Sequence, residues 1–160
     1  MVTVVSGGQT GVDRAALDAG LAAGLPYRGW CPQGGWAEDW PEPPGVFARY
    51  PGLKETPARV PEQRTEWNVR DSDALLVLVD GRGLTVSTGT ALGVEKAQAL
   101  GKPHVVIDMD SPDALRQMED VLRERGAQAI CIAGPRESEA PGIYDKAKAL
   151  LMQTLAANRA

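Results

Sequence analysis

Short apolar runs alternate with helix-forming segments along the whole chain, and this alternation constrains the fold more than any other feature. The clearest run is Ala74 to Val79, which is typical of a strand buried on both faces. Because strands that alternate with helices pair in parallel, the sequence predicts an α/β fold with helices on both faces of one mostly parallel sheet. The other strands are expected at Val2 to Val5, Tyr27 to Cys31, His104 to Asp108 and Ala129 to Ile132, and the helices at residues 10–23, 61–71, 89–100, 111–125 and 143–157.

A chain of 160 residues suits one core, so residues 1–160 are expected to form a single Rossmann-like domain. Residues 32–61 form an irregular insertion rich in proline and aromatic residues, with one short strand expected near Val46 to Tyr50. Seven of the eight aromatic side chains lie between Tyr27 and Trp67. We expect most of these rings to pack as a cluster over the sheet, and the alternative is that some stack on a heterocyclic ligand.

Charge and cysteine content exclude several classes of protein. A net charge of −4 offers no global attraction to nucleic acid, so no nucleic-acid partner is expected. No apolar run approaches the roughly 18 residues of a membrane span, so no membrane partner is expected either. Cys31 and Cys131 are too few for a disulfide framework, which predicts a cytoplasmic location. His104 is the only histidine, and we expect no metal site.

A glycine-rich turn, Ser6-Gly7-Gly8-Gln9-Thr10-Gly11, follows the first strand. It lacks the first glycine of the G-x-G-x-x-G dinucleotide fingerprint, and no acidic residue follows the second strand to hold a ribose. A Walker A loop is excluded because no Gly-Lys-Ser/Thr follows. A more general function remains, in which a helix amino terminus presents free N–H groups to an anion. The alternative is a tight turn without a ligand.

Two arginines lie in the first turns of predicted helices, where the positive end of the helix dipole disfavours a cation. Arg14 is therefore expected to meet a bound anion or to pair with a carboxylate such as Asp13. Arg64 shares one helix face with three other polar or aromatic residues at helical spacing. This face is either a solvated, salt-bridged surface or a wall of the ligand pocket, and its other members are Trp67, Asn68 and Asp71.

A second glycine- and hydroxyl-rich helix start, Ser87-Thr88-Gly89-Thr90, follows the central strand. We expect the first strand and the central strand to flank the topological switch point of the sheet, where ligands of doubly wound folds bind. The two helix starts would then converge on one crevice. Glu95, farther along the same helix, is a candidate general acid or base, although such a residue is more often a surface glutamate.

The loop Gly134 to Glu139 follows the last strand and carries Arg136 and Ser138. Arg136 is a candidate for bidentate contact with an anion, and the alternative is an ordinary charged loop. We expect the last strand at the edge of the sheet. The loop would then reach the crevice only by crossing the sheet edge or by coming from another subunit.

Taken together, these motifs make the chain similar to the molybdenum carrier family, whose members resemble molybdenum cofactor carrier proteins. The resemblance covers nearly the whole chain, and it implies a homo-oligomer, dimer or tetramer, with a pocket for the phosphate of molybdopterin or of a nucleotide-like ligand. It is carried by Ser6-Gly-Gly-Gln-Thr-Gly-Val-Asp-Arg14-Ala-Ala-Leu-Asp18, Gly29-Trp-Cys-Pro32, Ala37-Glu-Asp39, Arg64-Thr-Glu-Trp-Asn-Val-Arg-Asp-Ser-Asp73, Thr88-Gly-Thr-Ala-Leu92 and Ala133-Gly-Pro-Arg-Glu-Ser-Glu-Ala-Pro-Gly-Ile-Tyr144.

The family is similar in fold to a wider Rossmann-like superfamily that includes the LOG-type phosphoribohydrolases, and one motif departs from those enzymes. Their Pro-Gly-Gly-x-Gly-Thr-x-x-Glu motif places a glutamate three residues after a threonine. In this chain Glu95 stands five residues after Thr90, and the leading Pro-Gly-Gly is absent. Two extra residues rotate a helical side chain by about 200°, which argues against Glu95 as the equivalent residue.

The sequence therefore supports three hypotheses. The first is a binding or carrier protein for a phosphate-bearing anion, with molybdenum cofactor or a related pterin or nucleotide as cargo. The second is a nucleoside-monophosphate phosphoribohydrolase-like enzyme that uses Glu95 or Asp71. The third is a regulatory or structural domain without a ligand. The ligand-binding residues of the first hypothesis are Gly7, Gly8, Gln9, Thr10, Gly11, Arg14, Arg64, Asn68, Ser87, Thr88, Gly89, Thr90, Arg136 and Ser138.

Overall fold

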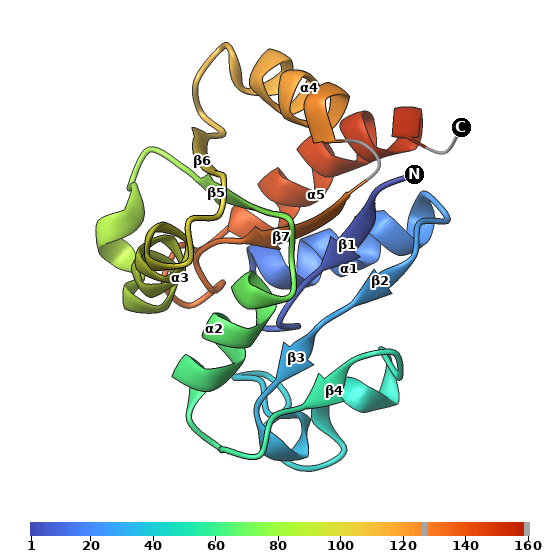
Figure 1. Ribbon diagram of the computed structural model, residues 1–160, viewed down its shortest axis with the longest axis vertical. Coiled ribbons are helices and arrows are strands. Elements are labelled where there is room, and N and C mark those ends of the chain that lie inside the picture. The colour runs from blue at the N-terminus through green and yellow to red at the C-terminus, as the bar shows by residue number, and fades with distance from the viewer. Residues whose placement is uncertain (126–127, 159–160) are drawn as a thin grey trace.

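A computed structural model describes residues 1–125 and 128–158 of the chain. Strands and helices alternate as predicted, apart from the insertion (Figure 1). The strands are β1 (Thr3–Val5), β2 (Tyr27–Arg28), β3 (Trp30–Cys31), β4 (Lys54–Glu55), β5 (Ala74–Val79), β6 (His104–Asp108) and β7 (Ala129–Ala133). The α-helices are α1 (Val12–Ala22), α2 (Pro61–Arg70), α3 (Thr88–Ala99), α4 (Ala114–Arg125) and α5 (Ile143–Leu155). No helix within the described ranges is both long and apolar enough to cross a bilayer.

The main sheet has the strand order β2-β1-β7-β5-β6, and all of its pairs are parallel. Every residue of β5 is buried, as expected of a central strand. The prediction that the last strand lies at the sheet edge is wrong, because β7 runs between β1 and β5. Ile130 of β7 is opposite Val4 on one side and Ala74 on the other. The chain leaves β1 and β5 in opposite directions, toward β2 and β6, and β7 fills the position between them.

Helices cover both faces of this sheet, as predicted (Figure 1). Alternate residues of β5 point to opposite faces, as the pleat of a strand requires. Leu76 and Leu78 pack in the core formed with α1, α4 and α5, while Leu75 and Val77 pack in a smaller core with α2 and α3. The chain is thus a single-domain, Rossmann-like α/β protein.

The insertion between β3 and α2 differs from its prediction in two places. Tyr27 to Cys31 is not one strand, because β2 pairs with β1 while β3 pairs with β4 in a separate two-stranded sheet. The strand expected near Val46 to Tyr50 is wrong, since Gly45–Ala48 forms a 3₁₀ helix. The apolar residues Val46 and Tyr50 are four apart, a helical spacing, and the Tyr50 N–H donates to the Val46 carbonyl at 2.8 Å.

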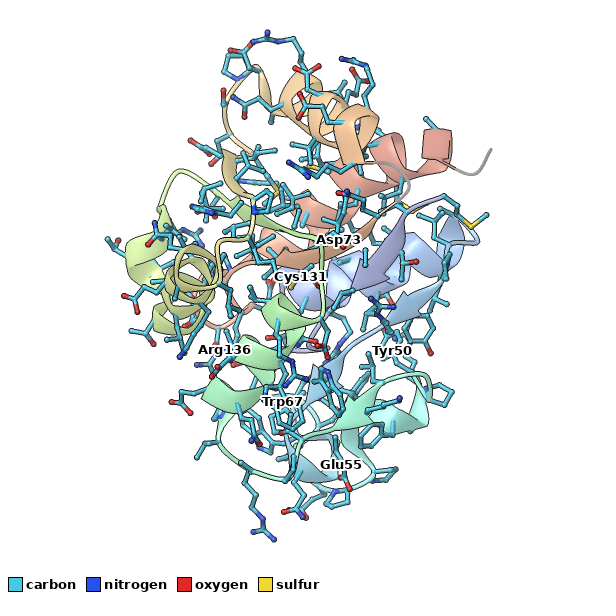
Figure 2. All side chains as sticks on the ribbon, viewed as in Figure 1. Tyr50, Glu55, Trp67, Asp73, Cys131 and Arg136 are labelled. Atoms are coloured by element: carbon cyan, nitrogen blue, oxygen red, sulfur yellow. The ribbon has the colours of Figure 1, made fainter. Side chains whose placement is uncertain are left out.

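Aromatic rings of this insertion pack as a cluster, as predicted, but the cluster lies over α1 rather than over the sheet. Tyr50 is fully buried in a third apolar cluster, over Leu17 of α1 (Figure 2). Tyr27, Trp40 and Phe47 pack around this cluster. The insertion is therefore an ordered layer built onto α1, and it reaches the end of the sheet where the functional motifs lie.

Candidate functional site

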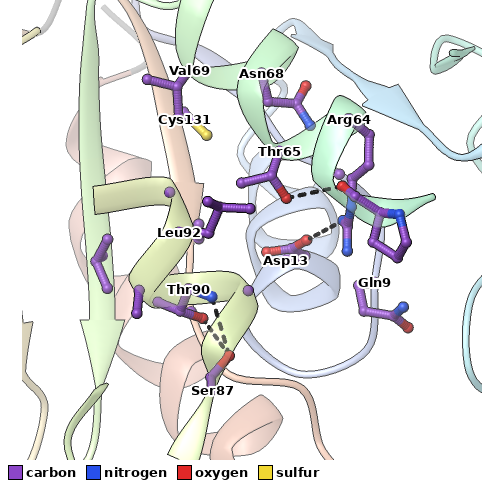
Figure 3. Close-up of a pocket in the computed structure, with 18 of the residues that line it drawn as sticks. Gln9, Asp13, Arg64, Thr65, Asn68, Val69, Ser87, Thr90, Leu92 and Cys131 are labelled. Atoms are coloured by element: carbon purple, nitrogen blue, oxygen red, sulfur yellow. Dashed lines mark hydrogen bonds and ion pairs between the residues drawn. The ribbon is translucent and has the colours of Figure 1, made fainter. Parts of the chain in front are cut away.

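A pocket of about 550 Å³ lies between α2 and α3 near the carboxyl ends of β5 and β7 (Figure 3). This is the switch point of the sheet, because α3 covers one face after β5 and α5 covers the other after β7. Leu75, Val77 and Cys131 line it from the sheet. Of the predicted ligand-binding residues, the lining includes Gly7, Gln9, Arg64, Asn68, Ser87, Thr88, Gly89, Thr90 and Arg136. It does not include Gly8, Thr10, Gly11, Arg14 or Ser138.

The amino end of α3 forms one side of the pocket. Ser87 caps the helix, because its Oγ accepts the N–H of Thr90 at 3.2 Å and lies 2.8 Å from Thr90 Oγ1 (Figure 3). Thr88 and Gly89 follow at the exposed mouth, and the first turn of α3 holds no acidic residue. The N–H groups that begin a helix have no partner within it, and they carry the positive end of its dipole. This side of the pocket is thus suited to an anion.

Arg64 of α2 and Asp13 of α1 form a buried ion pair on the opposite side (Figure 3). Arg64 Nη1 lies 3.2 Å from Asp13 Oδ2, and the two side chains are only 13% and 10% exposed. Burial raises the pKa of Asp13 above its ordinary value, although the nearby charge of Arg64 opposes that rise. Arg64 Nε is also buried, and it is the one buried side-chain nitrogen or oxygen that finds no hydrogen-bond partner in the described residues.

Gly7 makes room for this guanidinium. A Cβ atom built on Gly7 would lie 2.2 Å from Arg64 Nη1 and 3.1 Å from Asp13 Oδ2. Gln9 occupies the next part of the turn, where its Oε1 accepts the backbone N–H groups of Thr10 and Glu38. The glycine-rich turn therefore contributes Gly7 and Gln9 to the pocket lining.

The second half of the turn is covered by the loop after β7. The Pro135 carbonyl accepts the Val12 N–H at 3.3 Å, and a Cβ on Gly11 would lie 2.2 Å from that carbonyl oxygen. The helix expected from residue 10 begins later, because Gly11 stands at the N-cap of α1. The Thr10 hydroxyl instead donates to Glu38 and accepts the Glu137 N–H. The amino end of α1 is thus closed by its own chain, and α3 supplies the open helix end.

Arg14 was expected to meet either a bound anion or a carboxylate such as Asp13. It pairs with a carboxylate, that of Asp39. Its two Nη atoms donate to Asp39 at 2.8 and 2.9 Å, while Nε and Nη2 donate to the Gly8 carbonyl. The guanidinium carbon lies 4.0 Å from the ring centre of Trp40. Arg14 therefore fastens the insertion onto the glycine turn.

The polar face of α2 contacts both the pocket and the insertion. Asn68 lines the pocket. Its Oδ1 accepts the Trp30 backbone N–H at 2.8 Å, and its Nδ2 donates to the Trp30 carbonyl at 2.9 Å. Asp71 lies outside the pocket lining and accepts the Trp30 ring N–H at 2.7 Å. Hydrogen bonds from Arg70 hold the pKa of Asp71 below its ordinary value. A paired, low-pKa carboxylate outside the pocket is poorly placed for the acid–base role considered above.

The loop Gly134 to Glu139 reaches the pocket within the same subunit, because β7 is a central strand (Figure 2). The expectation that it must cross the sheet edge or come from another subunit is therefore wrong. Arg136 lies on the pocket lining with its side chain 40% exposed. Its Nη1 is 3.6 Å from Glu38 Oε2, and its Nε is 3.6 Å from Glu139 Oε1.

Several pocket residues were missed by the sequence analysis or left as weak candidates. Asp13 was considered only as a partner for Arg14, yet it lines the pocket and pairs with Arg64. Trp36 and Glu139 also line the pocket, and no local pattern marks either of them. Glu95 lines the pocket as an exposed residue two helical turns beyond Thr88. Among the residues described, no group of three or more metal-ligating side chains occurs.

Comparison with known proteins places the chain in a family. It matches no curated protein. It is similar to a crystal structure from Syntrophus aciditrophicus SB named "Putative molybdenum carrier protein", with a TM-score of 0.80 and 34% sequence identity over 96% of this chain and 93% of that chain. Residues 4–155 match the model of the circularly permutated YpsA SLOG family. These likenesses confirm the resemblance found in the sequence, and the chain belongs to the circularly permutated YpsA SLOG family.

Proposed function

We propose that the chain is a binding or carrier protein that holds a phosphate-bearing anion between α3 and Arg64. The observation that carries this proposal is the buried Arg64 guanidinium, which lines the pocket with its Nε unpaired. The open amino end of α3 lines the same pocket. Planar guanidinium N–H groups and free helix N–H groups are both strong donors to phosphate oxygens.

The apolar part of the pocket lining supports a ligand with a flat ring attached to its phosphate. It includes Leu75, Val77, Leu92 and Trp36. The molybdenum carrier name of the structure from Syntrophus aciditrophicus SB supports molybdenum cofactor, or a related pterin or nucleotide, as cargo. Native mass spectrometry of protein purified from its own host would identify the cargo directly.

Calorimetric titration with adenosine 5′-monophosphate and with inorganic phosphate tests the anion site. Replacing Arg64 by glutamine removes hydrogen bonds to a charged group, each worth about 1.5–3 kcal/mol, so affinity for both compounds should fall by roughly tenfold or more. Arg116→Gln on α4 makes the same change of charge at an exposed position outside the pocket lining. Equal affinities for the wild type and Arg64→Gln would overturn the proposal.

One observation favours a second candidate function, hydrolysis of the N-glycosidic bond of a nucleoside monophosphate. Glu95 lines the pocket on the same helix as the proposed anion site. Chromatography of nucleoside monophosphates incubated with the protein would detect a released base. If the wild type released a base and Glu95→Gln did not, the enzymatic function would be supported in place of the carrier function.

A cytoplasmic homo-oligomer, dimer or tetramer, is part of the same proposal. Cys31 and Cys131 are both buried free thiols, the state that a reducing compartment maintains. Strand β6 is one edge of the sheet, and Val106 on it is 39% exposed. Exposed sheet edges are commonly covered by other protein surface. Light scattering that finds only monomers at micromolar concentration would contradict the oligomer.

A further inference from the structure

The Asp13–Arg64 pair joins the two helix layers at the carboxyl edge of the sheet. Asp13 comes from α1 on one face, and Arg64 comes from α2 on the other. Only Nη1 of Arg64 has a hydrogen-bond partner, Asp13, within the part of the chain that the structure describes. The guanidinium therefore has donors left for a ligand, while one buried carboxylate already balances its charge.

An anion that binds to the remaining donors of Arg64 brings a second negative charge near Asp13. Two anions beside one cation in a desolvated pocket repel each other, and the like charge favours the protonated form of a carboxyl group. We infer that Asp13 takes up a proton when an anion binds beside Arg64, so that it acts as a positioning residue whose charge is set by the ligand. This inference rests on the proposed function.

Of the other titratable groups around Asp13, only the carboxylates of the pocket compete for the proton. Cys131 faces Asp13 from β7, and burial raises the pKa of its thiol, which therefore stays protonated. Arg14 and Arg136 are the other cations near this pair. Three further carboxylates line the pocket: the half-buried Glu139 on the loop after β7, the exposed Glu62 on α2 and the exposed Glu95 on α3.

The pH dependence has a definite sign. Burial has already raised the pKa of Asp13 in the free protein, and a bound anion raises it further. Between the free and the bound pKa values each binding event consumes up to one proton, and the dissociation constant rises by up to about tenfold per pH unit. Above the bound value, and below the free value, the dissociation constant of the anion is independent of pH at this site.

Sulfate is a suitable probe because it remains a dianion over the range in which carboxylates titrate. Calorimetry in two buffers of different ionisation enthalpy measures the protons taken up with each sulfate. We expect up to one proton for the wild type, and none for Asp13→Asn, in which sulfate affinity no longer varies with pH. Binding without proton uptake in the wild type would overturn the inference alone, and no binding at any pH would overturn the proposed function with it.

Two variants assign the proton. Asp120→Asn, a change on α4 at a side chain that is 46% exposed, should keep both the affinity and the uptake of the wild type. Glu139→Gln should keep the proton uptake of the wild type. If the uptake were lost in Glu139→Gln and kept in Asp13→Asn, the assignment of the proton to Asp13 would be overturned. If Asp13→Asn does not fold, carboxyl NMR titration of the wild type decides the question. Added sulfate must raise the pKa of Asp13, and an unchanged value would contradict the inference.

Discussion

The guanidinium of Arg64 occupies the space that a side chain at residue 7 would need. Gly8 and Gly11, in contrast, have positive φ angles of 74° and 76°, which favour glycine for backbone reasons. One glycine-rich turn therefore uses its glycines for two different purposes. The crowding at Gly7 concerns the pocket, because it fixes the position of the arginine that we propose to bind the ligand.

Gly7→Ala should therefore destabilise the fold and weaken anion binding. The added methyl group would displace Arg64 and press on Asp13, and overpacking of this kind costs about 1–3 kcal/mol. Gly93→Ala in α3 is the matched control, because its Cβ would meet its nearest neighbour, Thr65 Cγ2, at 3.7 Å. It should gain up to about 1 kcal/mol of helix stability. Urea unfolding of both variants measures the difference, and equal stabilities would contradict the crowding at Gly7.

The two arginines Arg14 and Arg64 show how far ion pairs can be predicted from a sequence. The location of Arg14 in a first helical turn correctly predicted that it needs a negative partner, and Arg64 was expected on a salt-bridged surface or on a wall of the pocket. The identity of the partners could not be predicted, because Asp39 lies in the irregular insertion and Asp13 belongs to a different helix from Arg64. Partners that meet only after folding leave no spacing pattern in the sequence.

Three segments meet at the carboxylate of Glu38, which comes from the insertion. It accepts hydrogen bonds from the Thr10 hydroxyl of the glycine turn and from the hydroxyl and N–H of Ser138 in the loop after β7. Burial alone would raise the pKa of Glu38, but these hydrogen bonds outweigh burial and hold the pKa below its ordinary value. Arg14 likewise holds the pKa of Asp39 low through hydrogen bonds. The insertion is thus fastened by two ionised carboxylates.

These contacts predict an acid-sensitive fold. A carboxylate with a lowered folded-state pKa contributes stability above its unfolded pKa, near 4.5 for Glu38, and this contribution is lost as the pH falls through the folded value. Glu38→Gln should therefore cost about 1–2 kcal/mol at pH 7 and show a weaker further loss in acid. Urea unfolding from pH 7 to pH 3 measures both quantities. Glu119→Gln, an exposed change on α4, should follow the wild type, and a Glu38→Gln curve parallel to the wild type would contradict the prediction.

Elements differed in how well the sequence predicted them. Five helices and the strands β1, β5, β6 and β7 have apolar periods long enough to identify them, and their predicted ranges need only small changes at the ends. Helix α4, for example, begins at Ala114 rather than Ser111, because the Ser111 side chain caps a preceding turn. The two-residue strands β3 and β4 are too short to carry a period. In the folded chain, β3 packs against α1 through Cys31 and is held by α2 through Trp30, contacts that have no local sequence pattern.

The order of the strands relates the whole molecule to a familiar topology. If β5, β6, β7, β1 and β2 are renumbered 1 to 5 in that order, the sheet read from β6 has the strand order 2-1-3-4-5. This is the order of flavodoxin-like doubly wound folds. The end of α5 lies near the amino terminus of the chain, where the two halves would be joined (Figure 1). The sequence showed the five strands of the main sheet, but their order depends on where the chain is opened. This is why β7 was predicted at the edge, and why the loop carrying Arg136 was expected to reach the pocket only across the sheet edge or from another subunit.

A chain opened elsewhere should therefore keep the same fold. We expect a permutant that begins at Val60, ends at Arg59 and joins residue 160 to Met1 by a short glycine–serine linker to fold and to bind anions as the wild type does. Val60 is 54% exposed, and the bond before it lies in an irregular segment.

In the native chain the central pair Val4 and Ile130 comes from opposite ends of the sequence. The permutant brings this pair close in sequence, which lowers contact order and should speed refolding. Stopped-flow refolding and phosphate calorimetry measure the two effects. Loss of cooperative unfolding at every linker length would show that the native opening of the chain is required for this sheet.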